Sequence, residues 1–162
     1  LGRLEEGKVD VKREPVNLNE LFAEVRDDIK LQLKEGQQIL LENEQSKIIN
    51  TDSRILRNIL VNLLSNASKY SEAGKMIYIS YVNGTRAVTI NVRDEGIGIP
   101  AEDQKHMFDR FFRASNAGNI PGTGLGLNIV KRYADLLGGS VHFVSEYAKG
   151  TTFFITIPQQ TP

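Results

Sequence analysis

Apolar residues recur every three or four positions in three stretches of the chain, residues 18–35, 52–69 and 125–137. This spacing follows the 3.6-residue turn of an α-helix and predicts three amphipathic helices that bury one face. Thr51 or Asp52 is expected to cap the second helix, and glycine follows the first and third, at Gly36 and at Gly138-Gly139. The core positions predicted for the first helix are Leu18, Leu21, Phe22, Val25, Ile29, Leu31 and Leu33, and those for the second are Ile55, Leu56, Ile59, Leu60, Leu63, Leu64 and Ala67.

Alternating apolar and polar residues and short apolar runs predict short strands before, between and after these helices. Asn83-Gly84 is a strong hairpin signal that joins two of the strands, whereas Pro15 breaks the first one. The order of elements predicts an α/β (α+β) two-layer sandwich, in which a mixed, mainly antiparallel sheet of about five strands carries three main helices on one face. The predicted strands cover residues 9–12, 38–42, 47–50, 76–82, 87–94, 140–145 and 151–157.

Residues 95–121 form a long polar, glycine-containing segment with one predicted short helix near residues 101–107. Segments of this length inside a compact domain are usually functional or disordered. We therefore expect this segment to be either functional or disordered.

Composition limits the classes of function. The chain has 162 residues, with 20 Lys+Arg and 20 Asp+Glu, so its net charge gives no reason to expect nucleic acid or an anionic membrane as a partner. It has no cysteine, which excludes disulfides and thiolate metal sites, and no apolar run approaches the roughly 20 residues of a membrane span. The first residue is Leu rather than Met, which suggests part of a longer protein.

Asn62, Asn66 and Lys69 lie on one seam at the edge of the apolar face of the second helix. Amide oxygens suit a hard cation such as Mg²⁺, and an ammonium group suits phosphate oxygens. The seam therefore predicts a bound, polar, phosphate-containing ligand. The alternative is that these asparagines are simply solvated at the helix edge.

Two glycine-containing segments extend this pattern. Asp94 ends a strand and precedes Gly96 and Gly98, so its carboxylate could accept a hydrogen bond from an exocyclic amine such as adenine N6. The segment from Gly122 to Leu127 leads directly into the third helix, where free N–H groups can hold phosphate. A plain Asp-Gly turn and a flexible hinge are the respective alternatives.

In this order, the segments resemble the ATP-binding catalytic domain of bacterial two-component sensor histidine kinases, a member of the Bergerat-fold group with gyrase, Hsp90 and MutL. Residues 62–70 are similar to the N box, 94–100 to the G1 box, 108–113 to the F box, 122–127 to the G2 box, and Gly150-Thr151 to the last glycine box. The resemblance covers nearly the whole chain. It implies ATP and Mg²⁺ as ligands, residues 1–8 as the end of a dimerisation helix, and residues 9–162 as the catalytic domain with a lid at about 95–121.

The resemblance also implies roles for individual residues. Asp94 would bind adenine N6 with help from Thr151, and Asn66 would be the main magnesium ligand with Asn62 beside it. In the F box, the phenylalanines would anchor the segment while Arg113 and Arg110 reach the phosphates. The remaining implied contacts are Lys69 to phosphate, Tyr70, Ile97 and Ile99 around the base, Gly96 and Gly98 in the G1 turn, Phe108 in the F box, and Gly122, Thr123, Gly124, Leu125, Gly126 and Leu127 along the triphosphate.

Asn62 separates the branches of this group, since the ATP-hydrolysing relatives carry Glu at the position it matches. An amide has no useful basicity near neutral pH and cannot activate water, so the resemblance implies a protein-histidine kinase. Neither His106 nor His142 resembles the acceptor histidine, so we expect no self-phosphorylation. The expected partners are a phosphoacceptor histidine domain of the same protein and a response regulator, with a cytoplasmic location and a parent protein that could be an inner-membrane sensor. The alternatives are a Bergerat-fold ATPase, an anti-sigma-type serine kinase and a non-catalytic nucleotide-binding module.

Overall fold

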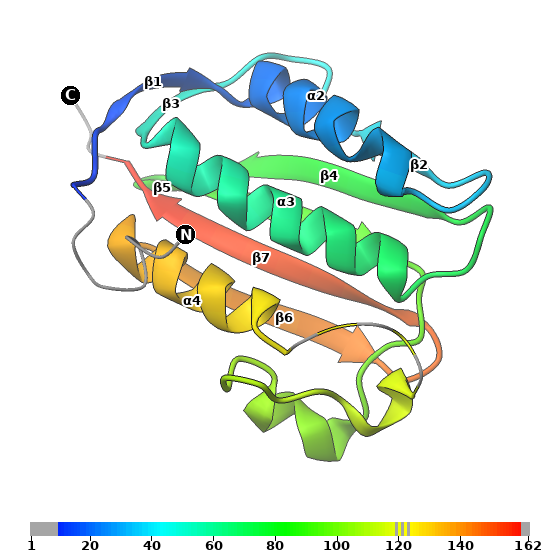
Figure 1. Ribbon diagram of the computed structural model, residues 1–162. Helices are drawn as coiled ribbons and strands as arrows, with labels where there is room; N and C mark the ends of the chain where they lie inside the picture. The colour runs from blue at the N-terminus through cyan, green and yellow to red at the C-terminus, as the bar shows by residue number, and fades with distance from the viewer. Residues whose placement is uncertain (1–9, 119, 121, 123, 160–162) are drawn as a thin grey trace.

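The computed structural model describes residues 10–118, 120, 122 and 124–159. Its main sheet has five strands in the order β2-β4-β5-β7-β6 (Figure 1). β2 runs parallel to β4, and every other neighbouring pair is antiparallel. The strands are β2 (Gln38–Leu41), β4 (Met76–Asn83), β5 (Ala87–Asp94), β6 (Ser140–Glu146) and β7 (Gly150–Pro158).

Three helices cover one face of this sheet, which confirms the predicted two-layer sandwich (Figure 1). They are α2 (Leu18–Ile29), α3 (Ser53–Lys69) and α4 (Gly126–Leu136), with α3 in the middle. All seven core positions predicted for α3 are buried, and they pack against inward residues of the strands such as Ile79 and Ile90. The predicted hairpin is also present, because the Gly84 N–H donates to the carbonyl of Ala87 at 2.8 Å.

The first helix is shorter than predicted. α2 ends at Ile29, and a 3₁₀ turn (Lys30–Gln32) follows it instead of continued α-helix. Leu31, predicted as a core position, is 99% exposed. Positions 29, 31 and 33 are two apart and cannot share one helix face, so the apolar pattern beyond Ile29 was misleading.

A separate two-stranded sheet pairs β1 (Glu14–Asn17) with β3 (Ile48–Thr51). The predicted strand at residues 9–12 is wrong over the described residues 10–12, which are irregular, and Pro15 lies inside the strand instead of ending it. Proline is tolerated here because a strand with a neighbour on one side only can do without one donor. The predicted helix end at residues 1–8 lies outside the described residues.

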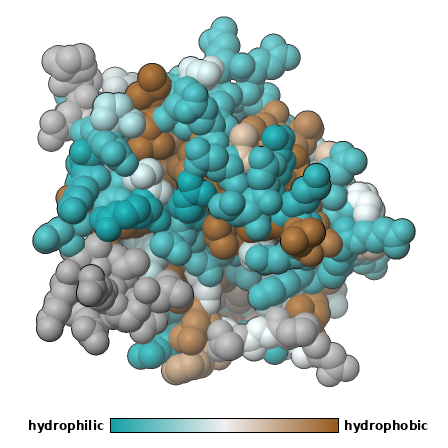
Figure 2. Space-filling view, turned by 45° about the horizontal axis from the view of Figure 1, so that its top comes forward, coloured by the Kyte–Doolittle hydropathy of each residue, from teal (hydrophilic) through white to brown (hydrophobic). Residues whose placement is uncertain are grey.

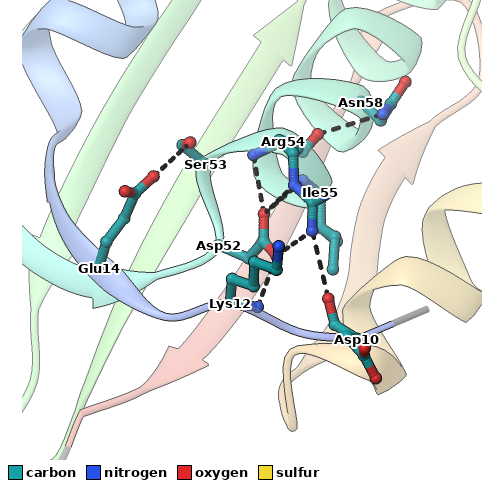
Figure 3. Close-up of polar contacts among 8 residues, drawn as sticks. All are labelled: Asp10, Lys12, Glu14, Asp52, Ser53, Arg54, Ile55 and Asn58. Atoms are coloured by element: carbon teal, nitrogen blue, oxygen red, sulfur yellow. Dashed lines mark hydrogen bonds and ion pairs between the residues drawn. The ribbon is translucent and has the colours of Figure 1, made fainter.

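Asp52 caps the N-terminus of α3 and ties the incoming segment to it (Figure 3). Its carboxylate accepts hydrogen bonds from the N–H groups of Lys12 (2.9 Å), Arg54 (3.0 Å) and Ile55 (3.3 Å), and from the Arg54 guanidinium. Burial alone would raise the pKa of Asp52, but the Arg54 side chain and these N–H groups outweigh it and hold the pKa below its ordinary value of 3.8. The predicted cap at this position is confirmed.

The surface is mainly hydrophilic on the face shown in Figure 2, where hydrophobic residues are scattered rather than gathered in one broad patch. Most large apolar side chains are instead enclosed between the helices and the sheet. Among the described residues, no helix combines the length and apolar character needed to cross a bilayer.

Candidate functional site

A cavity of about 200 Å³ lies where α3, the start of α4 and the loop after β5 meet. Fourteen of the residues predicted for the site line it, from segments that are far apart in the sequence. The sheet supplies Asp94 and Thr151, which are directly paired at the end of β5 and the start of β7. The fourteen are Asn62, Asn66, Lys69, Tyr70, Asp94, Ile97, Gly98, Ile99, Arg113, Gly122, Gly124, Gly126, Leu127 and Thr151.

Asp94 is the titratable group that its surroundings change most at this site. Burial raises the pKa of its carboxyl to about 6, although hydrogen bonds from the N–H groups of Gly96 and Thr151 oppose the change. The Gly96 N–H lies 2.9 Å from Asp94 Oδ1. A carboxylate that is partly desolvated and still open to a cavity is a strong acceptor for a ligand donor.

The glycines after Asp94 allow the loop to pack closely against two neighbours. A Cβ on Gly96 would lie 2.2 Å from the carbonyl oxygen of Tyr70. Gly98 has φ +68°, and a Cβ there would lie 2.1 Å from the carbonyl oxygen of Glu146. Since glycine has no side chain, the loop can pack closely against Tyr70 on one side and against the β6–β7 turn on the other. Ile97 and Ile99, in the same loop, line the cavity.

Asn62 and Asn66 face the start of α4 across the cavity. Asn62 Nδ2 donates to the carbonyl of Asn58 at 2.8 Å, which directs its Oδ1 toward Gly126. A Cβ on Gly126 would lie 3.3 Å from that Oδ1 and 3.8 Å from Asn66 Nδ2. Glycine at this position therefore leaves room beside both amides.

Donors and positive charges also line the cavity. α4 begins after Leu125, whose side chain makes no cap hydrogen bond, and the first N–H groups of a helix attract anionic ligands. Lys69 is exposed at its rim, and Arg113 is half-buried. Arg113 Nη2 donates to the carbonyl of Ile120, while its buried Nε has no partner among the described residues. This arrangement suits an anionic ligand.

Four predicted residues do not line the cavity, namely Gly96, Phe108, Arg110 and Leu125. Phe108 packs against the core and against Phe143, with ring centroids 5.7 Å apart. Arg110 lies over the ring of Phe111, 5.0 Å from its centroid, so the predicted reach of Arg110 into the site is absent here. The prediction for Thr123 lies outside the described residues.

The expected anchoring role of the F-box phenylalanines is correct only in part. Phe111 is 62% exposed and has φ +66°, so it points away from the core. Its backbone closes the loop instead, because the Phe111 N–H donates to the carbonyl of Gly124 at 3.0 Å. The sequence pattern alone does not reveal this left-handed turn.

Sequence reasoning did not assign seven lining residues to the site. Ser65 shares the helix face of Asn62, and Phe153 shares the strand face of Thr151, so helix and strand periodicity could have identified both. The other five belong to the segment between β5 and α4, whose path the sequence pattern does not define. The seven are Ser65, Met107, Phe112, Ala114, Asn116, Ala117 and Phe153.

Comparisons with known proteins agree with this geometry. Residues 51–161 match the family described as histidine kinase-, DNA gyrase B-, and HSP90-like ATPase. The chain is 33% identical to the circadian input-output histidine kinase CikA of Synechococcus elongatus, over 99% of this chain and 22% of CikA. It is 32% identical to the sensor histidine kinase YclK of Bacillus subtilis, over 93% of this chain and 33% of YclK.

Among solved structures, full-length ShkA in complex with AMPPNP has a TM-score of 0.82 and 25% identity, covering 99% of this chain and 34% of that one. The chain thus spans a fifth to a third of the length of the curated relatives named above. On this evidence, the chain belongs to the histidine kinase-, DNA gyrase B-, and HSP90-like ATPase family, within its sensor histidine kinase branch.

Proposed function

We propose that the cavity binds Mg-ATP and that the chain transfers the γ-phosphate to a histidine of a dimerisation domain in the same protein. The observation that carries the proposal is the combination of groups that line the cavity. Asp94, a partly buried carboxylate, lies there together with amides, cations and the N-terminus of α4. Adenine offers its amine to the carboxylate, and a triphosphate offers its charge to the cations and N–H groups.

The base would bind at the Asp94 end. Asp94 accepts a hydrogen bond from the exocyclic amine, and Thr151 assists from the neighbouring strand. Thr151 is itself held by Ser145, whose hydroxyl lies 2.8 Å from Thr151 Oγ1 and accepts from the Ile99 N–H at 2.8 Å. Tyr70, Ile97 and Ile99 then supply apolar surface to the faces of the base.

Asn66, with Asn62 beside it, fits a magnesium ion held mainly by oxygens. Among the described residues, no three His, Cys, Asp or Glu side chains are placed so that they could hold a metal ion together, so a cation here would rely on amide oxygens, phosphates and water. Mg²⁺ is commonly held in this way, through few protein ligands and several phosphate and water oxygens. When bound, the ion would neutralise charge on the transferring phosphoryl group.

Lys69 and Arg113 would hold the phosphates, together with the loop from Gly122 to Leu127. In the transfer, the bond between the γ-phosphorus and its bridging oxygen breaks as the acceptor imidazole nitrogen bonds to phosphorus, and ADP leaves. Asn62 lines the cavity where hydrolysing relatives need a base, and its amide cannot take a proton from water. We therefore favour transfer over hydrolysis.

The proposed acceptor histidine would belong to residues N-terminal to the catalytic domain, and residues 1–8 would lead from it. Residues 95–121 would act as a lid over the nucleotide. A response regulator would receive the phosphoryl group, and the domain would act in the cytoplasm, where ATP is supplied. These parts of the proposal rest on the sequence resemblance and on the relatives named above.

Calorimetric titration of the chain with Mg-ATP tests the proposal, with Asn66→Ala as the variant and Asn43→Ala, at a half-buried position that does not line the cavity, as the control. We expect binding by the native chain, weaker binding with Asn66→Ala, and no labelled phosphohistidine on the chain alone. Phosphohistidine should form only when the parent's acceptor domain is added. Steady phosphate release without any acceptor would instead indicate an ATPase.

A further inference from the structure

Helix α3 ends beside the proposed nucleotide site without the glycine that usually closes a helix. Its C-cap is Tyr70, followed by Ser71 and Glu72, so nothing in this local sequence supplies an αL turn for the last carbonyls. These carbonyls nonetheless need donors, because buried backbone oxygens are rarely left unpaired. Local N–H groups serve some of them, since Tyr70 donates to the carbonyls of Asn66 and Ser68. The remaining donors come from a different part of the chain.

Gln37, in the turn before β2, provides most of them. Its Nε2 donates to the carbonyl oxygens of Ser68 (3.1 Å), Ser71 (3.2 Å) and Glu72 (3.1 Å). Its Oε1 accepts from the Ser68 hydroxyl at 2.6 Å and from the Lys34 N–H at 2.9 Å. Gln37 is 6% exposed, so both ends of its amide are fixed in a buried position.

Lys34 completes the same cap from outside. Its Nζ donates to the carbonyl oxygens of Lys69 (2.9 Å) and Ser71 (2.7 Å). A cation at the C-terminus of a helix is also favoured by the helix dipole. The backbone of the two loops is joined as well, since the Gly74 N–H donates to the carbonyl of Glu35 at 2.8 Å.

The capped segment carries two side chains of the cavity, Lys69 and Tyr70. The carbonyl of Tyr70 accepts from the Ile97 N–H at 3.0 Å and lies against Gly96, so the same segment also positions the loop after Asp94. Gln37 and Lys34 do not line the cavity. They hold the backbone from which the two ends of the ligand are contacted.

We infer that Gln37, assisted by Lys34, is a positioning residue for nucleotide binding, acting through residues 68–72. The inference rests on the proposed function of the cavity. Without the Gln37 amide, residues 68–72 lose a buried side-chain link to the turn before β2, and the side chains of Lys69 and Tyr70 move relative to Asp94. Displacements of about 1 Å in a binding site are enough to weaken binding substantially.

Asn43 offers a matched control. Its amide also joins two segments, with Nδ2 donating to the Tyr81 carbonyl at 3.0 Å and Oδ1 accepting from the Tyr81 N–H at 2.7 Å. It lies at the other end of β4, away from Ile77, the residue paired with Asp94, and does not line the cavity. Asn43→Ala should therefore cost stability without moving the site.

The test compares Gln37→Ala and Asn43→Ala by calorimetry with Mg-ATP, at a temperature where circular dichroism shows both variants fully folded. Both should melt at lower temperature, but Gln37→Ala should bind roughly tenfold more weakly while Asn43→Ala stays within about twofold of the native chain. In nuclear magnetic resonance spectra, the Ile97 amide shift should change in Gln37→Ala and not in Asn43→Ala.

Lys34→Met and Lys34→Arg keep the inference testable if Gln37→Ala does not fold, because Lys34 is exposed. Lys34→Met should weaken binding a fewfold, whereas Lys34→Arg, which retains donors, should bind nearly as the native chain does. The inference would be overturned if Gln37→Ala bound Mg-ATP as tightly as the native chain. If Gln37→Ala does not fold, an affinity of Lys34→Met equal to that of the native chain would overturn it. If the native chain itself binds no Mg-ATP, the proposed function fails instead.

Discussion

Asp52 and Asp94 are two carboxyl groups withdrawn from water whose surroundings shift their pKa values in opposite directions. At the start of α3, donors surround Asp52 on every side, and they hold its pKa below the ordinary value despite burial. At the end of β5, burial dominates and raises the pKa of Asp94 to about 6. The Asp52 region is saturated with internal partners, whereas the Asp94 region has acceptor capacity left for a ligand.

We expect this difference to separate a residue that stabilises the fold, Asp52, from the proposed contact of the base, Asp94. A saturated carboxylate stabilises the folded state, since its charged form is preferred there. A desolvated carboxylate with few hydrogen-bond donors lowers the stability of the folded state, and such a loss of stability is common at functional sites. The contrast can be tested at each residue in turn.

Replacing Asp52 should have the largest effect on stability. Asp52→Ala removes the cap of α3 and leaves several N–H groups without a partner, so the free energy of unfolding should fall by about 2–3 kcal/mol. Chemical denaturation measures this change. Asn17→Ala is the control, because Asn17 caps α2 through a single bond to the Glu20 N–H and should cost only about 1 kcal/mol. An Asp52→Ala chain as stable as the native one would contradict the assignment.

Replacing Asp94 should show the reverse pattern. Asp94→Asn should weaken Mg-ATP binding roughly 10- to 100-fold, the effect of losing a hydrogen bond to a charged group. At neutral pH, the same variant should unfold at higher denaturant concentration, with a gain of about 1–3 kcal/mol, because the desolvated charge is gone. Calorimetry and denaturation together check both changes. Loss of stability without loss of affinity would place Asp94 with Asp52 as a residue that serves the fold.

The pH dependence of stability in the native chain should distinguish the contributions of Asp52 and Asp94, because they act in different pH ranges. Between about pH 4 and 6 the folded state binds more protons at Asp94 than the unfolded state does, so this residue makes stability fall as pH rises through that window. Asp52 has a lowered pKa, so its contribution is present above pH 3.8 and is lost as pH falls further. Nucleotide affinity should rise through about pH 6 as Asp94 ionises.

Titration of the ATP phosphates also affects binding in this range. Asp94→Asn measured under the same conditions corrects for it, because both proteins bind the same nucleotide. The native chain should lose more affinity than the variant when the pH is lowered from 7 to 5. Parallel pH profiles for the two proteins would count against Asp94 as a contact of the base.

The smallest change is expected for Arg54→Ala, which removes only the side-chain donor to Asp52. The backbone N–H groups of Lys12, Arg54 and Ile55 remain, so stability should fall by less than it does in Asp52→Ala. Acid unfolding should begin at a higher pH than in the native chain, since the pKa of Asp52 rises toward its ordinary value. Monitoring helical circular dichroism during acid titration measures this shift.

Sequence reasoning reached most of the fold and site because both depend on local patterns. The buried face of α3 and the Asn83-Gly84 hairpin are each explained by residues close in sequence. The glycines at 96, 98 and 126 were recognised from short sequence motifs, although the neighbours that leave little or no room for a side chain there lie far away in the sequence. The Leu31 error came from a local pattern, because positions 29, 31 and 33 cannot share one helix face. The other errors are non-local. Pro15 looked like a strand end because its partner strand lies more than 30 residues away.

The role of Gln37 was missed for the same physical reason. Nothing near Gln37 in the sequence indicates that its amide would cap a helix that ends more than 30 residues later. Asn116 gives a second example, since its Nδ2 donates to the carbonyl of Gly98 at 2.9 Å only because of the path taken by the loop between β5 and α4. The periodicity of apolar residues predicts the structure within one segment, and it does not predict contacts such as these between distant segments.

The position of β7 has a consequence for how the chain folds. It is the last strand of the sheet in sequence, yet it lies between β5 and β6, and it brings Thr151 beside Asp94. On a ribosome, the exposed edge of β5 must wait more than 50 residues for this partner. Because such long-range pairing is slow to form, we expect the sheet to close late. The base-binding end of the cavity would then form in the same final step, so a nascent chain could not hold nucleotide before its core is complete.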